Sequence, residues 1–168
     1  MEPDVPPSRM DLSLPCEAAT ARLATLLARE LSAGDTLLLS GPLGAGKTAL
    51  ARALIGARAV AGGLDPPEVP SPSYTLVQTY EIGDLTIWHV DLYRLGEAGE
   101  LIELGLDEAF ETALCLVEWP ERLGPLAPAD ALHLALSHGA GDSAREAALT
   151  APGPRARALL RRLEGTLG

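Results

Sequence analysis

Apolar residues follow two patterns along the chain, and each pattern predicts a different kind of element. Uninterrupted apolar runs at 36–40 and 113–117 suit strands that are buried on both faces of a sheet. Leucines recur at helical spacing over 23–31 and again over 159–167. Buried strands combined with amphipathic helices are typical of an α/β protein with parallel strands at its centre.

The remaining segments predict antiparallel strands added to this central sheet. Gly83-Asp84 separates two of them, as a hairpin turn does. Residues 60–72, with four prolines and two glycines, form a loop within the domain, because no separate core lies on either side. We expect one domain over residues 10–168 and a disordered N-terminus over residues 1–9. The additional elements are strands at 10–14, 74–82, 85–90, 131–137 and 146–150, and helices at 49–55 and 100–110.

One glycine-rich stretch carries a phosphate-binding motif. Gly41-Pro42-Leu43-Gly44-Ala45-Gly46-Lys47-Thr48 matches G-x-x-x-x-G-K-[ST] at every fixed position. A predicted strand precedes it and a predicted helix follows, so the helix dipole adds to the anion site. Lys47 is expected on the β/γ-phosphates and Thr48 on Mg²⁺. The predicted fold is a single-domain P-loop NTPase, with a central parallel sheet extended by antiparallel strands and flanked by helices.

Composition and charge narrow the range of partners. Lys47 is the only lysine among thirteen basic residues, and the others are arginines. The compact ammonium charge of a lysine therefore occurs only at the position where the motif would bind phosphate. The formal net charge of −10 disfavours extensive nucleic-acid binding by this chain alone. Cys16 and Cys115 do not have the spacing of a metal site or a disulfide framework. Without a signal pattern or an apolar run of membrane-spanning length, we expect a cytoplasmic protein and no membrane partner.

Candidate carboxylates for nucleotide hydrolysis lie at the ends of two predicted strands. Glu118 directly follows the second buried run, where P-loop ATPases place a residue of the Mg²⁺ shell; the alternative is a surface glutamate ending a strand. His89, Asp91 and Tyr93 share one face if their strand continues, although an exposed edge strand would show the same pattern. Asp91 is expected to order the attacking water or the Mg²⁺ shell. Arg94 either neutralises negative charge on the γ-phosphate or forms ion pairs with nearby acidic side chains.

Three further features bear on function. Ser71-Pro72-Ser73-Tyr74 is hydroxyl-rich and ends the long loop, and such a loop can close over a γ-phosphate. With one lysine, the chain cannot contain the Asn-Lys-x-Asp element of guanine recognition, so ATP is the expected nucleotide. Trp119 is either a lid or a partner contact. The arginines near the C-terminus form a solvated helix face or, alternatively, a docking surface; they are Arg155, Arg157, Arg161 and Arg162.

These segments together resemble a known family. In order along the chain stand the P-loop, Ser-Pro-Ser-Tyr-Thr-Leu-Val at 71–77, His-Val-Asp-Leu-Tyr-Arg-Leu at 89–95, Glu-Leu-x-Glu-Leu-Gly-Leu from Glu100, and Leu-Val-Glu-Trp-Pro at 116–120. This order is similar to that of the TsaE (YjeE) family, ATPases of bacterial tRNA threonylcarbamoyladenosine biosynthesis. The resemblance covers about residues 10–160. Pro42 departs from it, since the family has an acidic residue there.

The resemblance implies a Mg²⁺-dependent ATPase that docks on TsaD, works with TsaB and resets that complex between turnovers. Transfer RNA would then be reached only through the complex. Lys47, Asp91 and Glu118 would serve hydrolysis, and Thr48 and Glu118 would be the Mg²⁺ ligands. The nucleotide contacts implied by the motif and the resemblance are Gly41, Leu43, Gly44, Ala45, Gly46, Lys47, Thr48, Glu17 and Arg145.

Two other classes of protein share a P-loop. A small-molecule kinase needs a basic lid and an acceptor pocket, whereas residues 95–118 are acidic and only Arg122 stands near the expected lid position. A non-catalytic nucleotide-binding module would not need Lys47, Thr48, Asp91 and Glu118 together. The accessory ATPase is therefore the favoured hypothesis and the kinase its alternative.

Overall fold

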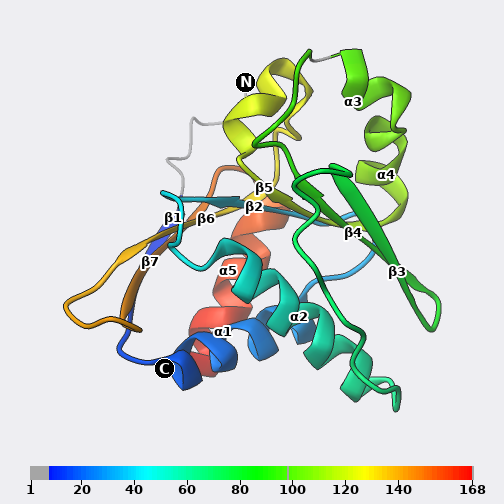
Figure 1. Cartoon of the computed structure of the whole chain (residues 1–168). Helices are drawn as coiled ribbons and strands as arrows, with labels where there is room; N and C mark the ends of the chain where they lie inside the picture. Colours follow the sequence, from blue (N-terminus) through cyan, green and yellow to red (C-terminus); the bar gives the residue numbers. More distant parts are fainter. Residues whose placement is uncertain (1–7, 98, 168) are drawn as a thin grey trace, which may run out of the picture.

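A mixed sheet of seven strands forms the centre of the fold, with helices on both faces (Figure 1). The computed structural model describes residues 8–97 and 99–167. The elements are β1 (Ser8–Leu14), α1 (Glu17–Glu30), β2 (Thr36–Ser40), α2 (Lys47–Ala61), β3 (Val77–Ile82), β4 (Leu85–Asp91), α3 (Gly99–Glu103), α4 (Leu106–Thr112), β5 (Leu114–Glu118), the 3₁₀ helix η1 (Pro120–Leu126), β6 (Leu132–His138), β7 (Arg145–Ala151) and α5 (Pro154–Leu167).

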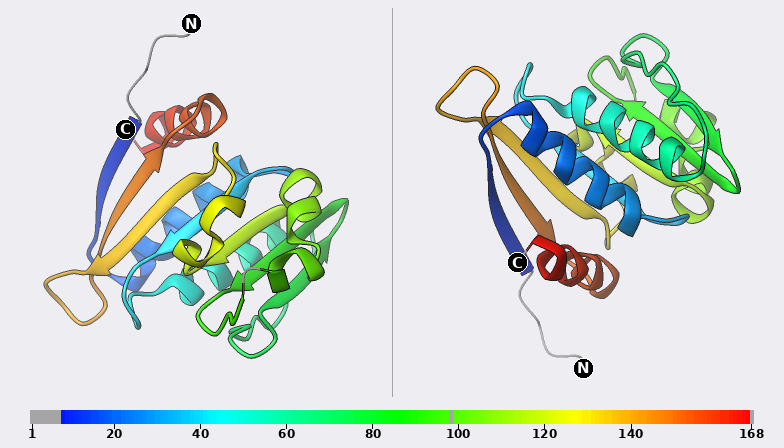
Figure 2. Two further views of the ribbon diagram at one scale, coloured as in Figure 1. Left: turned by 90° about the horizontal axis from the view of Figure 1, so that it is seen from above. Right: turned by 90° about the horizontal axis from the view of Figure 1, so that it is seen from below.

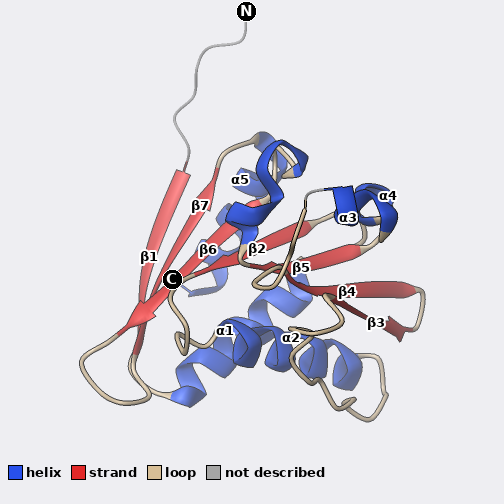
Figure 3. Ribbon diagram, turned by 45° about the horizontal axis from the view of Figure 1, so that its top comes forward, coloured by secondary structure: helices blue, strands red, loops and turns tan. Residues whose placement is uncertain are grey.

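The strand order, β1-β7-β6-β2-β5-β4-β3, places the parallel strands in the middle. β2 pairs in parallel with both β5 and β6, and β4 pairs in parallel with β5. β7, β1 and β3 are antiparallel to their neighbours, and β1 and β3 lie at opposite edges (Figure 3). The predicted fold class, a parallel centre with antiparallel additions, is confirmed.

Each face of the sheet has its own apolar core. α1, α2 and α5 cover one face and contribute leucines and alanines such as Leu27, Leu54 and Leu160. α3, α4 and η1 cover the other face over part of the sheet, around Val90 and Val117 (Figure 2). Because β2 and β5 are covered on both faces, the three central residues of β2 and the first four of β5 are apolar and buried, as the sequence pattern predicted.

Two predicted helices differ from the structure. We predicted that the first of these helices ends at residue 55, before Gly56, but α2 continues to Ala61. The glycine costs about 1 kcal/mol of helix propensity, but the added turn lets Arg58 donate hydrogen bonds to Ala28 O (2.6 Å) and Leu31 O (2.9 Å) at the end of α1. The helix predicted at 100–110 is wrong as a single element: it is two short helices, because Gly105 has φ 82° and begins α4 instead of continuing α3.

The first strand begins at Ser8, two residues before the predicted edge strand. Of the N-terminal segment predicted to be disordered, residues 1–7 lie outside the described part of the chain, and Ser8 and Arg9 belong to β1. Burial raises the pKa of the Cys115 thiol to about 12, in keeping with an inert apolar position. Among the helices of the described residues, none has the length and hydropathy needed to cross a bilayer.

A buried carboxylate holds α5 against the start of β2. Asp35 is only 5% exposed; it accepts hydrogen bonds from Ser32 N (2.8 Å) on one oxygen and from Arg155 Nε (2.5 Å) on the other. Arg162 forms a second link, to Glu30 of α1 at 2.6 Å. These two arginines therefore serve packing, which agrees with a helix face that flanks the leucines.

Replacing Asp35 with asparagine should destabilise the fold. Both carboxylate oxygens accept hydrogen bonds, one from Ser32 N and the other from Arg155 Nε. The amide of asparagine must point its NH₂ group at one of these two donors, and that hydrogen bond is lost. We expect a loss of about 2 kcal/mol and a Tm lower by about 4–8 °C, measured by differential scanning calorimetry. Asp11→Asn is the matched control, because the Arg9–Asp11 pair lies on the surface and should leave the Tm unchanged. Equal Tm values for Asp35→Asn and wild type would contradict this role.

Candidate nucleotide-binding site

The glycine-rich loop joins the carboxyl end of β2 to the first residue of α2. Gly41 has φ 140°, and a Cβ there would lie 2.3 Å from Leu136 O in the neighbouring strand β6, so only glycine fits. Gly46 is the N-cap of α2 in the left-handed region and offers no side-chain cap. The positive end of the dipole of this fifteen-residue helix faces the loop, and no acidic residue in the first turn offsets it.

Lys47 lies folded back over the loop and under an aromatic ring. Its Nζ donates to Gly41 O (2.5 Å) and Pro42 O (3.1 Å), and it lies 3.8 Å from the ring centroid of Trp119. Burial lowers the pKa of the amine, against an opposing effect of Glu118, Glu121 and Asp91. The residue is only 5% exposed, and what it does expose borders the hollow beside the loop.

Glu118 joins the loop to the centre of the sheet. It is the last residue of β5, 2% exposed, and its carboxylate accepts hydrogen bonds from Thr48 Oγ1, at 2.8 Å to Oε1 and 3.0 Å to Oε2. On its other side, Glu118 Oε2 lies 2.7 Å from His89 Nε2. The alternative of a surface glutamate is therefore excluded by its burial.

Asp91 is the last residue of β4 and pairs in register with Glu118. Its Oδ1 accepts a hydrogen bond from Tyr93 N (3.0 Å), and Ser71 Oγ lies 3.4 Å from its Oδ2. Since Ser71 belongs to the loop between α2 and β3, Asp91 connects that loop to the same end of the sheet as Glu118. β4 is an inner strand with β3 outside it, so the alternative of an exposed edge strand is wrong for His89 and Asp91.

Two hollows flank the loop. One, of about 520 Å³, is bordered by Lys47 and Thr48 and by Asp91, Glu118 and Trp119. The other, of about 530 Å³, contains Glu17 on α1 and shares Arg145 with the first. Every predicted nucleotide-site residue therefore lies in one of these two hollows or in the loop between them. Gly41 belongs to the loop and lies against β6.

Arg145 contacts the loop itself. Its guanidinium donates to Ala45 O (2.9 Å) and Gly44 O (3.3 Å), and also to Asp142 O and Ala144 O in its own turn. It therefore ties the β6–β7 connection to the backbone of the phosphate loop. No local sequence pattern predicts this contact, because it joins positions one hundred residues apart.

The residues at the loop fit a magnesium ion. Thr48 and Glu118 offer oxygen ligands less than 3 Å apart, which is the donor chemistry that Mg²⁺ prefers. Within residues 8–97 and 99–167, no group of three or more His, Cys, Asp and Glu side chains could hold a metal. A site with few protein ligands suits Mg²⁺, which keeps several waters and takes substrate phosphates, better than an ion that needs a full protein cage.

Aromatic and arginine side chains form the outer wall of the first hollow. The rings of Tyr93 and Trp119 are 5.0 Å apart, and the guanidinium of Arg94 lies 4.4 Å from the ring of Tyr74. Trp119 has φ 59°, a strained conformation for a residue other than glycine, which turns its ring over Lys47. Arg122 lies beside the backbone oxygens of Tyr93 and Leu95, so it packs against the chain and does not form a lid.

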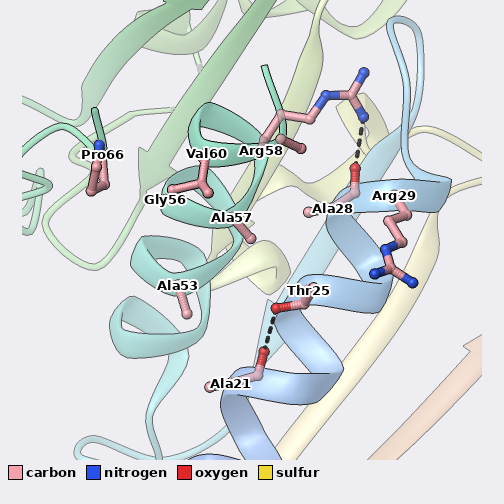
Figure 4. A pocket seen from close by; sticks show the side chains of 11 residues that line it. Ala21, Thr25, Ala28, Arg29, Ala53, Gly56, Ala57, Arg58, Val60 and Pro66 are labelled. Atoms are coloured by element: carbon pink, nitrogen blue, oxygen red, sulfur yellow. Dashed lines mark hydrogen bonds between the residues drawn. The ribbon is translucent and has the colours of Figure 1, made fainter. Parts of the chain in front are cut away.

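A third hollow lies away from the phosphate loop. This groove of about 820 Å³ runs between α1 and α2 and is lined mostly by small side chains, including Ala21, Ala53 and Ala57, with Arg29 and Arg58 at its rim (Figure 4). It contains none of the predicted site residues. Arg58 points toward α1, where it donates to Ala28 O, which accounts for its position without a ligand.

The strand, glycine loop and helix at the parallel centre of the sheet, with a hydroxyl and a carboxylate meeting beside them, define a P-loop α/β protein. The family model for the threonylcarbamoyl adenosine biosynthesis protein TsaE matches residues 14–147. The chain belongs to the TsaE family.

Similar proteins agree with this membership. The TsaE protein of Bacillus subtilis is 38% identical over 138 residues, which cover 81% of this chain and 82% of that protein. The TsaE protein of Rickettsia conorii is 43% identical over 109 residues, which cover 65% of this chain and 60% of the relative's length. The crystal structure of Bacillus subtilis YdiB is similar with a TM-score of 0.76 and 29% identity, covering 96% of this chain and 98% of that chain.

Proposed function

We propose that the chain is a Mg²⁺-dependent ATPase that acts as an accessory protein in threonylcarbamoyladenosine modification of tRNA. It would dock on a TsaD–TsaB complex and reset that complex between turnovers, so that it reaches tRNA only through its partners. The family and the names of its relatives support the pathway. The hydrogen bond from Thr48 to Glu118 supports the chemistry most directly, because it joins the P-loop hydroxyl to a buried carboxylate.

Each site residue has a distinct task in this proposal. The loop from Gly41 to Thr48 would bind the phosphates through its backbone and the α2 dipole, with Leu43, Gly44, Ala45 and Gly46 as contacts. Lys47 would leave the carbonyls of Gly41 and Pro42 and bind the β- and γ-phosphates. Glu17 and Arg145 border the second hollow, where the nucleoside would lie.

Thr48 and Glu118 would hold the magnesium ion, which when bound neutralises charge on the phosphates. Asp91 would orient the attacking water from the same edge of the sheet, since its carboxylate is fixed by Tyr93 N and Ser71. Trp119 would exclude bulk water from above Lys47. Phosphoryl transfer depends mostly on positioning and charge neutralisation. No arginine besides Arg94 and Arg145 lines the first hollow in the part of the chain that is described, so turnover should be slow without a partner.

Steady-state hydrolysis with and without partners tests the proposal. Purified chain is incubated with ATP and Mg²⁺, alone and with TsaD–TsaB, and both inorganic phosphate and phosphorylated products are quantified. We expect slow release of phosphate by the chain alone and at least about tenfold acceleration with the partners. Fast phosphate release at the same rate with and without the partners would contradict the accessory role. Transfer of the γ-phosphoryl group to a small-molecule acceptor would instead support the kinase alternative.

A further inference from the structure

We propose that His89 is a positioning residue, which fixes the carboxylate of Glu118 for the bound metal through a hydrogen bond from its Nε2. This inference rests on the proposed function, because it concerns the Mg²⁺ site of that function. No part of the predicted site assigned His89 a role in the interior, where its side chain is fully buried.

The geometry of two parallel strands places His89 behind the carboxylate. His89 pairs in register with Leu116, and Asp91 pairs with Glu118, so all four side chains project from one face of the sheet. Nearer the start of the strands, that face is apolar, with Ile87 and Leu114 in the core. The same face becomes polar at His89, two residues before β4 ends at Asp91. His89 therefore lies between the apolar core and the two carboxylates.

The hydrogen bonds of Glu118 divide between two neighbours. Thr48 Oγ1 approaches Oε1 most closely, at 2.8 Å, and His89 Nε2 lies 2.7 Å from Oε2. An ion held by Thr48 and Glu118 would draw on the oxygens that share this contact. The bond from His89 would hold Oε2, which also lies 3.0 Å from Thr48 Oγ1, and so fix the orientation of the carboxylate. A carboxylate only accepts, so Nε2 carries the proton of this bond.

The other ring nitrogen argues against a purely structural role. His89 Nδ1 is buried and has no hydrogen-bond partner among the described residues. An unsatisfied buried polar atom lowers stability, so an aliphatic side chain would serve packing better at this position. Full burial also keeps His89 from contact with nucleotide or water, which excludes a direct role as base. What the imidazole adds here is a donor aimed at Glu118.

Outer hydrogen bonds of this kind set metal affinity, and their loss typically costs 10–100-fold. The quantity to measure is the gain in ATP affinity on adding Mg²⁺, obtained by titration calorimetry in Mg²⁺ and in EDTA. His89→Leu should lower this gain by about 10–100-fold, while affinity in EDTA stays within about threefold of wild type. His89→Gln places an amide donor near the position of Nε2 and should retain most of the gain, whereas the shorter His89→Asn should not.

Ile87→Val is the matched control, since it removes packing two residues earlier on the same strand and face. It should lower the Tm without changing the Mg²⁺-linked gain. An unchanged gain in His89→Leu, or equal losses in the Gln and Asn variants, would overturn the positioning role while leaving ATP binding intact. If His89→Leu does not fold, the comparison of Gln with Asn decides. Wild-type protein that binds no ATP in either condition would instead overturn the proposed function.

Discussion

Replacing Lys47 with alanine is expected to lower ATP affinity by about a hundredfold or more. The amine would form charge-assisted hydrogen bonds with the phosphates, each contributing about 1.5–3 kcal/mol, and two of them correspond to about two or more powers of ten in affinity. No other lysine can replace it, because Lys47 is the only one in the chain. Titration calorimetry with ATP and Mg²⁺ measures the loss directly.

Two controls separate the phosphate contact from a general effect of charge. Lys47→Arg keeps the charge but exchanges a compact ammonium for a planar fork, so it should not restore affinity. Arg29→Ala removes a cation at the α1–α2 groove, away from the loop, and should bind like wild type. Undiminished affinity in Lys47→Ala would refute the assignment of the loop.

Glu118→Gln should lower ATP hydrolysis by about 100-fold or more while nucleotide affinity in EDTA changes little. The substitution keeps the shape of the side chain and removes the charge opposite Thr48, so it weakens the metal site without disturbing the phosphate contacts. Phosphate release in the presence of the partners gives the rate, and calorimetry gives the affinity. Glu121→Gln is the matched control: Glu121 also acts on the Lys47 amine, but it is exposed in the 3₁₀ helix. Hydrolysis at the wild-type rate in Glu118→Gln would remove this residue from the metal site.

The centre of the fold could be predicted because its signals are local. The strand at Thr36–Ser40 has the predicted bounds, and the buried run before Glu118 is the neighbouring strand. A P-loop needs glycines at fixed positions, and Gly41 shows why, since its close approach to Leu136 O excludes a Cβ. Both signals lie within a few consecutive residues, so they can be recognised without knowledge of the tertiary structure.

The features that the sequence did not reveal depend on contacts distant in sequence or on a single backbone angle. The predicted helix end at Gly56 is wrong, because Arg58 beyond it donates a hydrogen bond to the end of α1 and the helix continues. Gly105 interrupts a pattern that resembles one helix, and only its positive φ divides it. His89 appeared as one of three polar residues on a strand of unknown position. Its hydrogen bond to Glu118 depends on the register of β4 and β5, which periodicity does not specify.

Nucleotide-dependent association with TsaD–TsaB is the most direct test of the proposal that ATP binding controls another protein. Sedimentation velocity of the chain mixed with the complex is measured with ATP and Mg²⁺, without nucleotide, and with the Lys47→Ala variant. We expect the chain to co-sediment with the complex when Mg²⁺ and ATP are present, and to separate from it without nucleotide or with the variant. No association in any nucleotide state, or equal association in all of them, would contradict the proposal.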